Sequence, residues 1–320
     1  MPCWTKVLCF SPASCASFHA VPVYNCRVVT ETAFPAGYRL LDQPEDAAGK
    51  IDLWYPASSS AHERVLNYRM GSRGLAAPDA PPLQGPMPVV VLSSGDFGAP
   101  VGYSWVGESL ARRGFIVAGT GPTPRDCSAA LDAVLAEAEF QSAADPGRIA
   151  AIGHSAGGAA VIALAGAILD ARAMAEYCGS RAAQGDRACP EGMPAHAGLT
   201  LRDERVRAVV AMDPTGGPGH DARSLSLIRI PVLIVGSVDN DYAPFAHHAG
   251  RYARLIPGAS LNPLAHGEGH FVFVDECSGE VTAQGVSVCR DRAGVRRASV
   301  HAWLAEKIAR FLKEALSEGR

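Results

Sequence analysis

Hydrophobic positions along this chain fall into two alternating patterns, short continuous runs and longer segments at helical spacing. Short apolar runs bounded by proline, glycine or polar residues are typical of strands buried on both faces of a parallel sheet. Such runs occupy residues 89–92, 115–118, 149–152, 206–212 and 232–235. Apolar residues at helical spacing predict helices at 103–113, 129–140, 159–173 and 299–315. The alternation predicts an α/β fold with a mostly parallel central sheet flanked by helices.

Other segments depart from this rhythm. Residues 51–55 alternate apolar and polar side chains, which predicts a half-buried, antiparallel strand. Residues 58–87 are rich in Ser, Ala, Pro and Gly and predict a long surface loop. Residues 174–204 form an insertion that is either a lid over a site or a passive surface loop. We therefore expect an N-terminal tail of uncertain order at 1–45 and a single domain at 46–318.

Composition narrows the functional classes. Hydrophobic residues make up 48% of the chain and charged residues 19%, with a net charge of -3. This balance lacks the basic footprint of a nucleic-acid-binding protein. No apolar run reaches the roughly 18 residues that a membrane-spanning helix needs. We expect neither a nucleic-acid partner nor a transmembrane segment.

Four of the nine cysteines form two local pairs, Cys178 with Cys189 and Cys277 with Cys289. Neither pair has histidines at zinc-ligand spacing. We predict two disulfides, which favour a periplasmic or secreted protein. The alternative is reduced thiols in a cytoplasmic enzyme. The N-terminal residues match a secretory signal poorly, because their apolar stretch is shorter than the usual one of about 7–15 residues.

The strongest chemical signal is Gly153-His-Ser-Ala-Gly157, which follows an apolar strand and precedes a helix. This G-x-S-x-G pattern is typical of a nucleophile elbow, in which a sharp turn exposes a serine hydroxyl above the sheet. Glycines are needed where flanking side chains would clash. We predict Ser155 as the nucleophile, with the N–H of Ala156 at a helix N-terminus as an oxyanion donor.

A serine needs a base, and in this chain order the acid and then the histidine follow it. We predict His270 as the base, with His266 as the alternative, because both lie in a Gly-rich loop late in the chain. His154 is expected to be structural, and His247 and His248 to lie on the surface.

The acid is predicted in the segment Gly236-Ser-Val-Asp-Asn-Asp241, directly after the run at 232–235. Asp239 and Asp241 both qualify, and we prefer Asp239. The second oxyanion donor is predicted in the loop after residues 89–92, as the N–H of Asp96 with Phe97 as the alternative. The Asp96 carboxylate is expected to face away from the oxyanion or to pair with a cation.

At these residues the chain resembles the serine-type predicted dienelactone hydrolases, which are related to platelet-activating-factor acetylhydrolases and cutinase-like polyester hydrolases. The resemblance covers about residues 50–315 and rests on the motifs at 53–56, 89–98, 105–117, 153–158, 231–244 and 269–273. It implies an α/β-hydrolase fold with Ser155, His270 and Asp239 as a triad. Two features depart from the group. Ser94-Gly95 stands where the group usually has His-Gly or Pro-Gly. In the acid loop, the position of the family's acid counted forward from Gly236 is Asp239, but counted back from Pro244 it is Asn240, which indicates a one-residue insertion.

These observations predict a serine carboxylic-ester hydrolase that forms an acyl-enzyme and needs neither metal nor cofactor. Its substrate is expected to be a small-molecule or polymeric ester. The same triad also serves thioesterases, lactonases, amidases and acyltransferases. A non-catalytic binding protein on a hydrolase fold is the remaining alternative.

Overall fold

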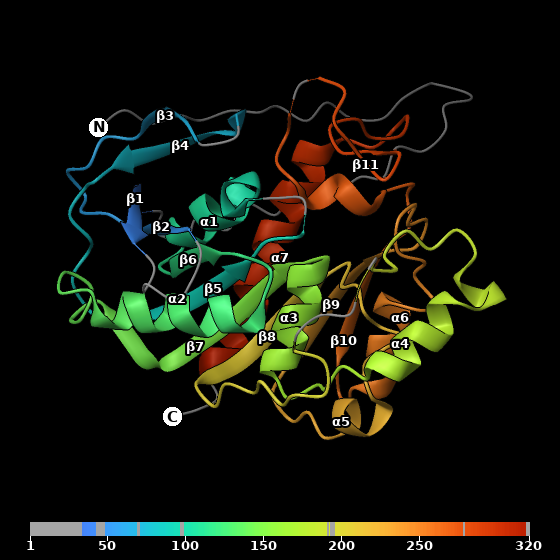
Figure 1. The fold of residues 1–320 in the computed structure, drawn as a ribbon. Helices are drawn as coiled ribbons and strands as arrows, with labels where there is room; N and C mark the ends of the chain where they lie inside the picture. The colour runs from blue at the N-terminus through green and yellow to red at the C-terminus, as the bar shows by residue number, and fades with distance from the viewer. Residues whose placement is uncertain are drawn as a thin grey trace, which may run out of the picture.

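The computed structural model describes residues 34–42, 49–68, 71–96, 99–190, 192, 196–277 and 279–317. Their main element is a ten-stranded sheet in the order β10-β9-β8-β7-β5-β6-β2-β1-β4-β3, with helices on both faces (Figure 1). Strands β5 to β10 run parallel to one another, and β2 is antiparallel to both β1 and β6. The strands are β1 (Ala36–Asp42), β2 (Lys50–Pro56), β3 (Arg64–Asn67), β4 (Arg73–Pro78), β5 (Met87–Ser93), β6 (Ile116–Thr120), β7 (Ala144–His154), β8 (Val206–Met212), β9 (Val232–Ser237) and β10 (Ser260–Leu264).

Two hydrophobic cores lie on opposite faces of this sheet. In β5, Val89 and Val91 belong to one core, whereas Val90 and Leu92 belong to the other. Both faces of the strand are therefore buried, which explains why its sequence is continuously apolar. Helices α2, α3 and α6 contribute to the first core, and α1 and α7 to the second. The α-helices are α1 (Ser104–Ala111), α2 (Pro124–Ala136), α3 (Ala156–Leu164), α4 (Ala171–Cys178), α5 (Ala222–Ser226), α6 (Ala249–Leu255) and α7 (Arg297–Ser317).

The predicted α/β architecture is confirmed, and every strand predicted from a hydrophobic run is present. Two predicted segments were wrong. The proposed surface loop at 58–87 contains β3 and β4, which extend the sheet beyond β1. The proposed helix at 159–173 is two helices, α3 and α4, because the chain turns between them through Gly166 in a left-handed conformation with φ 115°.

Two strands were missed at the edges of the pattern. Strand β10 contains Pro263 and only two leucines, so its sequence lacks an apolar run, and it lies at one edge of the sheet. Proline is tolerated there because an edge strand has an unpaired side. Strand β1 lies inside the predicted tail at 1–45, so the sheet begins at Ala36. The N-terminal segment that matches a secretory signal poorly falls within residues 1–33, which lie outside the described residues.

Both predicted disulfides are confirmed: Cys178 is bonded to Cys189, and Cys277 to Cys289. The first joins the end of α4 to the insertion. The second encloses the short hairpin of β11 (Thr282–Ala283) and β12 (Val286–Ser287). Of the cysteines that the structure describes, Cys127 on α2 is free, and it is buried.

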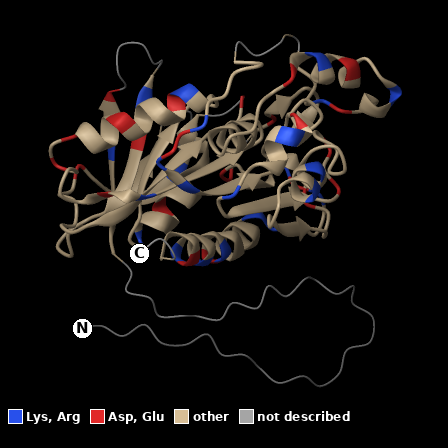
Figure 2. Cartoon of the chain, turned by 90° about the horizontal axis from the view of Figure 1, so that it is seen from below, with Lys and Arg blue, Asp and Glu red and all other residues tan. Residues whose placement is uncertain are grey.

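In the view of Figure 2, basic and acidic residues are interspersed along helices and loops. Within the described ranges, no helix has the length and apolarity needed to cross a membrane. The same part of the chain holds no group of three or more His, Cys, Asp or Glu side chains that could bind a metal ion.

Candidate active site

Ser155 lies at the sharp turn between β7 and α3. Its backbone has φ 57° and ψ -121°, a strained conformation for a residue with a side chain. The turn is tight because a Cβ at Gly153 would collide with the backbone of Gly157, and one at Gly157 with the carbonyl of Ser93. The sequence motif therefore forms the elbow that it predicts, with Ser155 nearly buried.

His270 is positioned beside this serine by a distant part of the chain. It begins the 3-10 helix η4 (His270–Phe273), which follows β10, and its Nε2 lies 3.0 Å from Ser155 Oγ. The imidazole is fully buried and stacks on the ring of Tyr242 at 4.7 Å. Burial lowers the pKa of His270 well below its usual value. The structure thus brings together the predicted nucleophile and base, with a neutral imidazole.

The carboxylate at the other side of His270 is Asp213, at the end of β8. Its Oδ2 lies 3.7 Å from His270 Nδ1, and its Oδ1 accepts a hydrogen bond from the Ser237 N–H at 2.7 Å. Burial raises the pKa of Asp213 to about 8. Asn240 Nδ2 also lies 3.2 Å from His270 Nδ1, so an amide and a carboxyl group both face this nitrogen.

The predicted acid residues do not occupy this position. Asp239 is exposed, and its described contact is made by its backbone oxygen, with Arg292. Asp241 accepts a hydrogen bond from the His270 backbone N–H at 3.0 Å and pairs with Arg292 at 3.2 Å, so it holds the base loop rather than the imidazole. The geometry contradicts the predicted acid because Asn240 is the residue of this loop that faces Nδ1.

Position alone could have pointed to Asp213. It directly follows the hydrophobic run at 206–212, so it lies at the same carboxyl edge of the parallel sheet as Ser155. The alternative base His266 is exposed, and its backbone N–H donates to Glu268. It is not placed at Ser155 by any described contact.

His154 connects three parts of the site. The Gly95 N–H donates to Tyr103 Oη at 3.1 Å, and Tyr103 Oη lies 2.9 Å from His154 Nδ1. The tyrosine hydroxyl therefore donates to Nδ1, and His154 Nε2–H donates to the His270 carbonyl at 3.0 Å. Burial lowers the pKa of His154 to about 3, which keeps the ring neutral. His154 contacts the base loop at His270 and Tyr103 beside the elbow, and these contacts suit the structural role predicted for it.

The two predicted oxyanion residues, Ala156 and Asp96, line one pocket. Ala156 is the first residue of α3, where a helix leaves its N–H groups without intrahelical acceptors. The Asp96 side chain is exposed. The alternative donor Phe97 lies outside the described residues. The positions of Ala156 and Asp96 suit the role of oxyanion donors, and this role stays a prediction.

The pocket has a volume of about 320 Å³ and extends from the elbow toward the insertion. Most of its wall is apolar and made of small side chains, with a few polar groups among them. The insertion at 174–204 contributes part of this wall through Met174, Ala188, Pro190 and His196. The lining residues are Asp96, Pro122, Thr123, Ala156, Ala159, Ala160, Leu169, Met174, Ala188, Pro190, His196, Thr215, Gly216 and His220.

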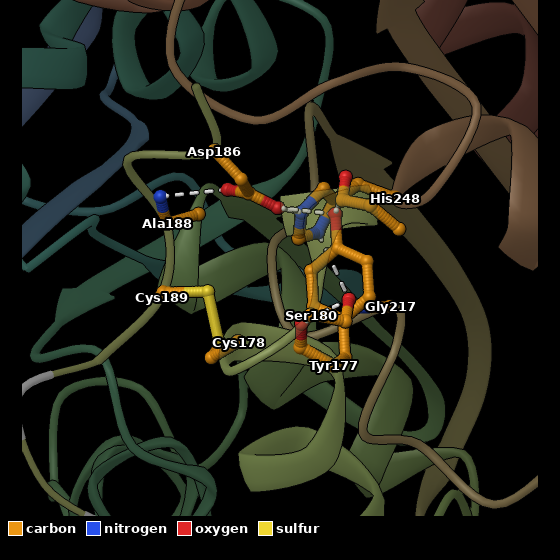
Figure 3. Close-up of a disulfide and its surroundings, with 9 residues drawn as sticks. Tyr177, Cys178, Ser180, Asp186, Ala188, Cys189, Gly217 and His248 are labelled. Atoms are coloured by element: carbon orange, nitrogen blue, oxygen red, sulfur yellow. Dashed lines mark hydrogen bonds and ion pairs between the residues drawn. A yellow bond between two sulfur atoms is a disulfide. The ribbon is translucent and has the colours of Figure 1, made fainter. Parts of the chain in front are cut away.

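Asp186 ties the insertion to the body of the domain (Figure 3). Its carboxylate lies 2.8 Å from His248 Nε2 and accepts hydrogen bonds from Tyr177 Oη and the Ala188 N–H, each at 2.8 Å. Burial alone would raise the pKa of Asp186, but the bonds from His248 and Tyr177 lower it. His248 is buried, so its predicted surface location was wrong. Beside this cluster, the Cys178–Cys189 disulfide closes the same segment.

A mostly parallel sheet with a serine at the turn after a central strand, and a histidine and carboxylate from later strands, defines an α/β-hydrolase fold. Among solved structures, the chain is similar to a ferulic acid esterase from Streptomyces cinnamoneus, with a TM-score of 0.61 over 92% of this chain and 93% of that one. The two are 19% identical, so the likeness shows the fold. No protein-family model matches the sequence, and no curated protein matches it significantly.

Proposed function

We propose that this protein is a serine carboxylic-ester hydrolase. The observation that carries the proposal is the 3.0 Å approach of His270 Nε2 to Ser155 Oγ at the N-terminus of α3. A buried, neutral imidazole at hydrogen-bond distance from a serine hydroxyl is the arrangement that a general base requires. The esterase named among the similar structures supports the same reaction class.

In the proposed reaction, Ser155 Oγ attacks the acyl carbon while His270 Nε2 takes its proton. The carbonyl oxygen becomes an oxyanion, which the N–H groups of Ala156 and Asp96 stabilise. His270 returns the proton to the departing alcohol, leaving an acyl-enzyme. Water, deprotonated by His270, then attacks the acyl carbon and the bond from that carbon to Ser155 Oγ breaks. His270 returns the proton to Ser155 Oγ, and the acid is released.

Asp213 stabilises the imidazolium that forms in each step. For this role His270 must carry its proton on Nδ1 and direct it at Asp213 Oδ2, leaving Nε2 free to accept the serine proton. Asn240 Nδ2 is a hydrogen-bond donor and favours the opposite tautomer, with Nδ1 unprotonated. We infer that Asp213 in its charged form selects the active tautomer against Asn240.

The finer assignments are also proposals. We propose that the protein is related to the serine-type dienelactone hydrolases and the platelet-activating-factor acetylhydrolases, on the basis of the motifs at 153–158 and 269–273. The two disulfides support a periplasmic or secreted location, because such bonds persist in oxidising compartments. Thioesters, lactones and amides pass through the same acyl-enzyme and are candidates in a substrate panel.

Hydrolysis of p-nitrophenyl butyrate tests the function. Wild-type protein should turn it over and be labelled by a fluorophosphonate probe, and Ser155→Ala should abolish both. Ser226→Ala, at an exposed serine on α5, is the matched control and should behave as wild type. Undiminished turnover by Ser155→Ala would refute the mechanism. An unlabelled Ser155 in folded protein would favour the non-catalytic alternative.

A further inference from the structure

His220 is a buried imidazole in the wall of the substrate pocket. It lies in the loop between β8 and α5, where it forms an isolated β-bridge with Leu169, and it is 3% exposed. The reaction proposed above does not use it. Its neighbours in the pocket wall are mainly small or apolar, so a polar atom at this point stands out.

The hydrogen bonds of His220 determine which ring nitrogen carries the proton. Tyr252 Oη donates its single proton to the Thr215 carbonyl at 2.7 Å. The same oxygen lies 2.6 Å from His220 Nδ1, and the Gly216 carbonyl lies 3.2 Å from that nitrogen. Neither oxygen has a proton to give, so both accept from His220 Nδ1–H.

The second nitrogen, Nε2, is therefore an acceptor. Burial lowers the pKa of His220 to about 4, so the ring carries one proton at neutral pH and that proton is on Nδ1. Among the described residues, none donates a hydrogen bond to Nε2. In the described part of the chain, the side-chain atoms that are both fully buried and without a hydrogen-bond partner are Ser94 Oγ and Asp213 Oδ2, and His220 Nε2 is not one of them. Nε2 is thus reachable, and the pocket is the space that His220 lines.

We propose that His220 Nε2 accepts a hydrogen bond from the substrate, so that the pocket selects esters whose bound group carries a hydroxyl. An unpaired acceptor in a mostly apolar wall discriminates between ligands, because a group without a donor would leave Nε2 desolvated and unpaired. The inference rests on the proposed function for its substrate class, but the recognition step can be tested without turnover.

The test measures binding of uncleaved esters to Ser155→Ala by calorimetry. One matched pair is methyl 3-(4-hydroxyphenyl)propanoate and its 4-methyl analogue, which differ in a hydroxyl against a methyl group of similar size. A second pair, 4-hydroxybenzyl acetate and 4-methylbenzyl acetate, places the hydroxyl in the alcohol part. We expect the hydroxyl member of at least one pair to bind about 10-fold more tightly, the size of one buried neutral hydrogen bond.

His220→Asn in the Ser155→Ala background should remove this preference. Asparagine can donate an N–H near the position of Nδ1, which preserves the bonds to Tyr252 and Gly216, but it does not reach the position of Nε2. His62→Asn, at an exposed histidine, is the matched control and should keep the 10-fold preference.

Equal binding within both pairs, or no binding of any ester, would overturn the inference. So would a preference that survives in folded His220→Asn protein. The comparison within Ser155→Ala decides the matter even if His220→Asn does not fold. These binding results do not depend on catalysis, because the hydroxyl preference is measured from binding alone. The proposed function fails separately, if the fluorophosphonate probe does not label the wild-type protein.

Discussion

At a pH above about 8, where Asp213 is charged, replacing it by asparagine removes a buried negative charge from beside the imidazole of His270 and leaves a side chain of nearly the same shape. At the observed 3.7 Å, Coulomb's law with an effective dielectric constant of about 20 gives about 4–5 kcal/mol of stabilisation for the imidazolium. Each ~1.4 kcal/mol corresponds to a factor of ten in rate. We therefore expect Asp213→Asn to lower kcat/KM by about three orders of magnitude.

The assay is hydrolysis of p-nitrophenyl butyrate, with active sites counted by fluorophosphonate labelling. Asp239→Asn is the matched control, because the Asp239 side chain is exposed and its described contact is made by its backbone oxygen, with Arg292. It should keep wild-type activity.

The double variant Asp213→Asn/Asn240→Asp supplies a second test. It returns a carboxylate to the atom position that lies 3.2 Å from Nδ1, so it should recover at least about ten-fold of the lost activity. Full activity in Asp213→Asn together with loss in Asp239→Asn would refute the assignment of the acid.

Two further predictions concern pH and the pocket wall. Burial raises the pKa of Asp213 to about 8 and lowers that of His270, so the pair holds one proton through neutral pH. We therefore expect kcat/KM, measured from pH 6 to 9, to rise with an apparent pKa near 8. A profile with an apparent pKa near 6.5, the ordinary value of a histidine, would contradict this prediction. Removing the Cys178–Cys189 disulfide with paired Cys→Ser substitutions should raise KM several-fold with little change in kcat, because this disulfide holds the part of the pocket wall that includes Ala188. The control is Cys277→Ser/Cys289→Ser, which removes a disulfide away from the pocket lining and should lower Tm but leave KM unchanged.

The sequence predicted the central fold well because its strands are buried on both faces and therefore read as apolar runs. The G-x-S-x-G motif with its flanking elements was enough to place Ser155 at the elbow, since the sterics of Gly153 and Gly157 are local. The edge strand β10 was missed because edge strands need not be apolar, and its Pro263 argues against a strand.

The sequence offers carboxylates after two predicted strands, Asp213 after 206–212 and the pair Asp239 and Asp241 after 232–235, and choosing among them depends on how these loops pack around His270. In the predicted acid segment, three consecutive residues, Asp239, Asn240 and Asp241, carry a carboxylate, an amide and a carboxylate. Which one faces Nδ1 is decided by backbone bonds: the Asn240 Oδ1 accepts from the N–H groups of Tyr242 and Ala243 and turns its amide nitrogen to the ring. The burial of His248 was missed for a similar reason, because its partner Asp186 is 62 residues away.

The neutral histidines of this fold also limit the acidity that it can withstand. Burial lowers the pKa values of His154, His220 and His301 to about 3, 4 and 4. Below the ordinary value of about 6.5, the unfolded chain takes up protons at these three rings that the folded chain does not, so the three rings together favour unfolding by up to about 4 kcal/mol per pH unit. Asp213 acts in the opposite direction, because between its folded pKa of about 8 and its ordinary value the folded chain holds the extra proton, which favours folding by up to about 1.4 kcal/mol per pH unit. A typical domain has only about 5–15 kcal/mol in reserve. Stability in acid is therefore set by two opposing groups of buried side chains: the neutral histidines, which favour unfolding, and Asp213, which favours the folded state.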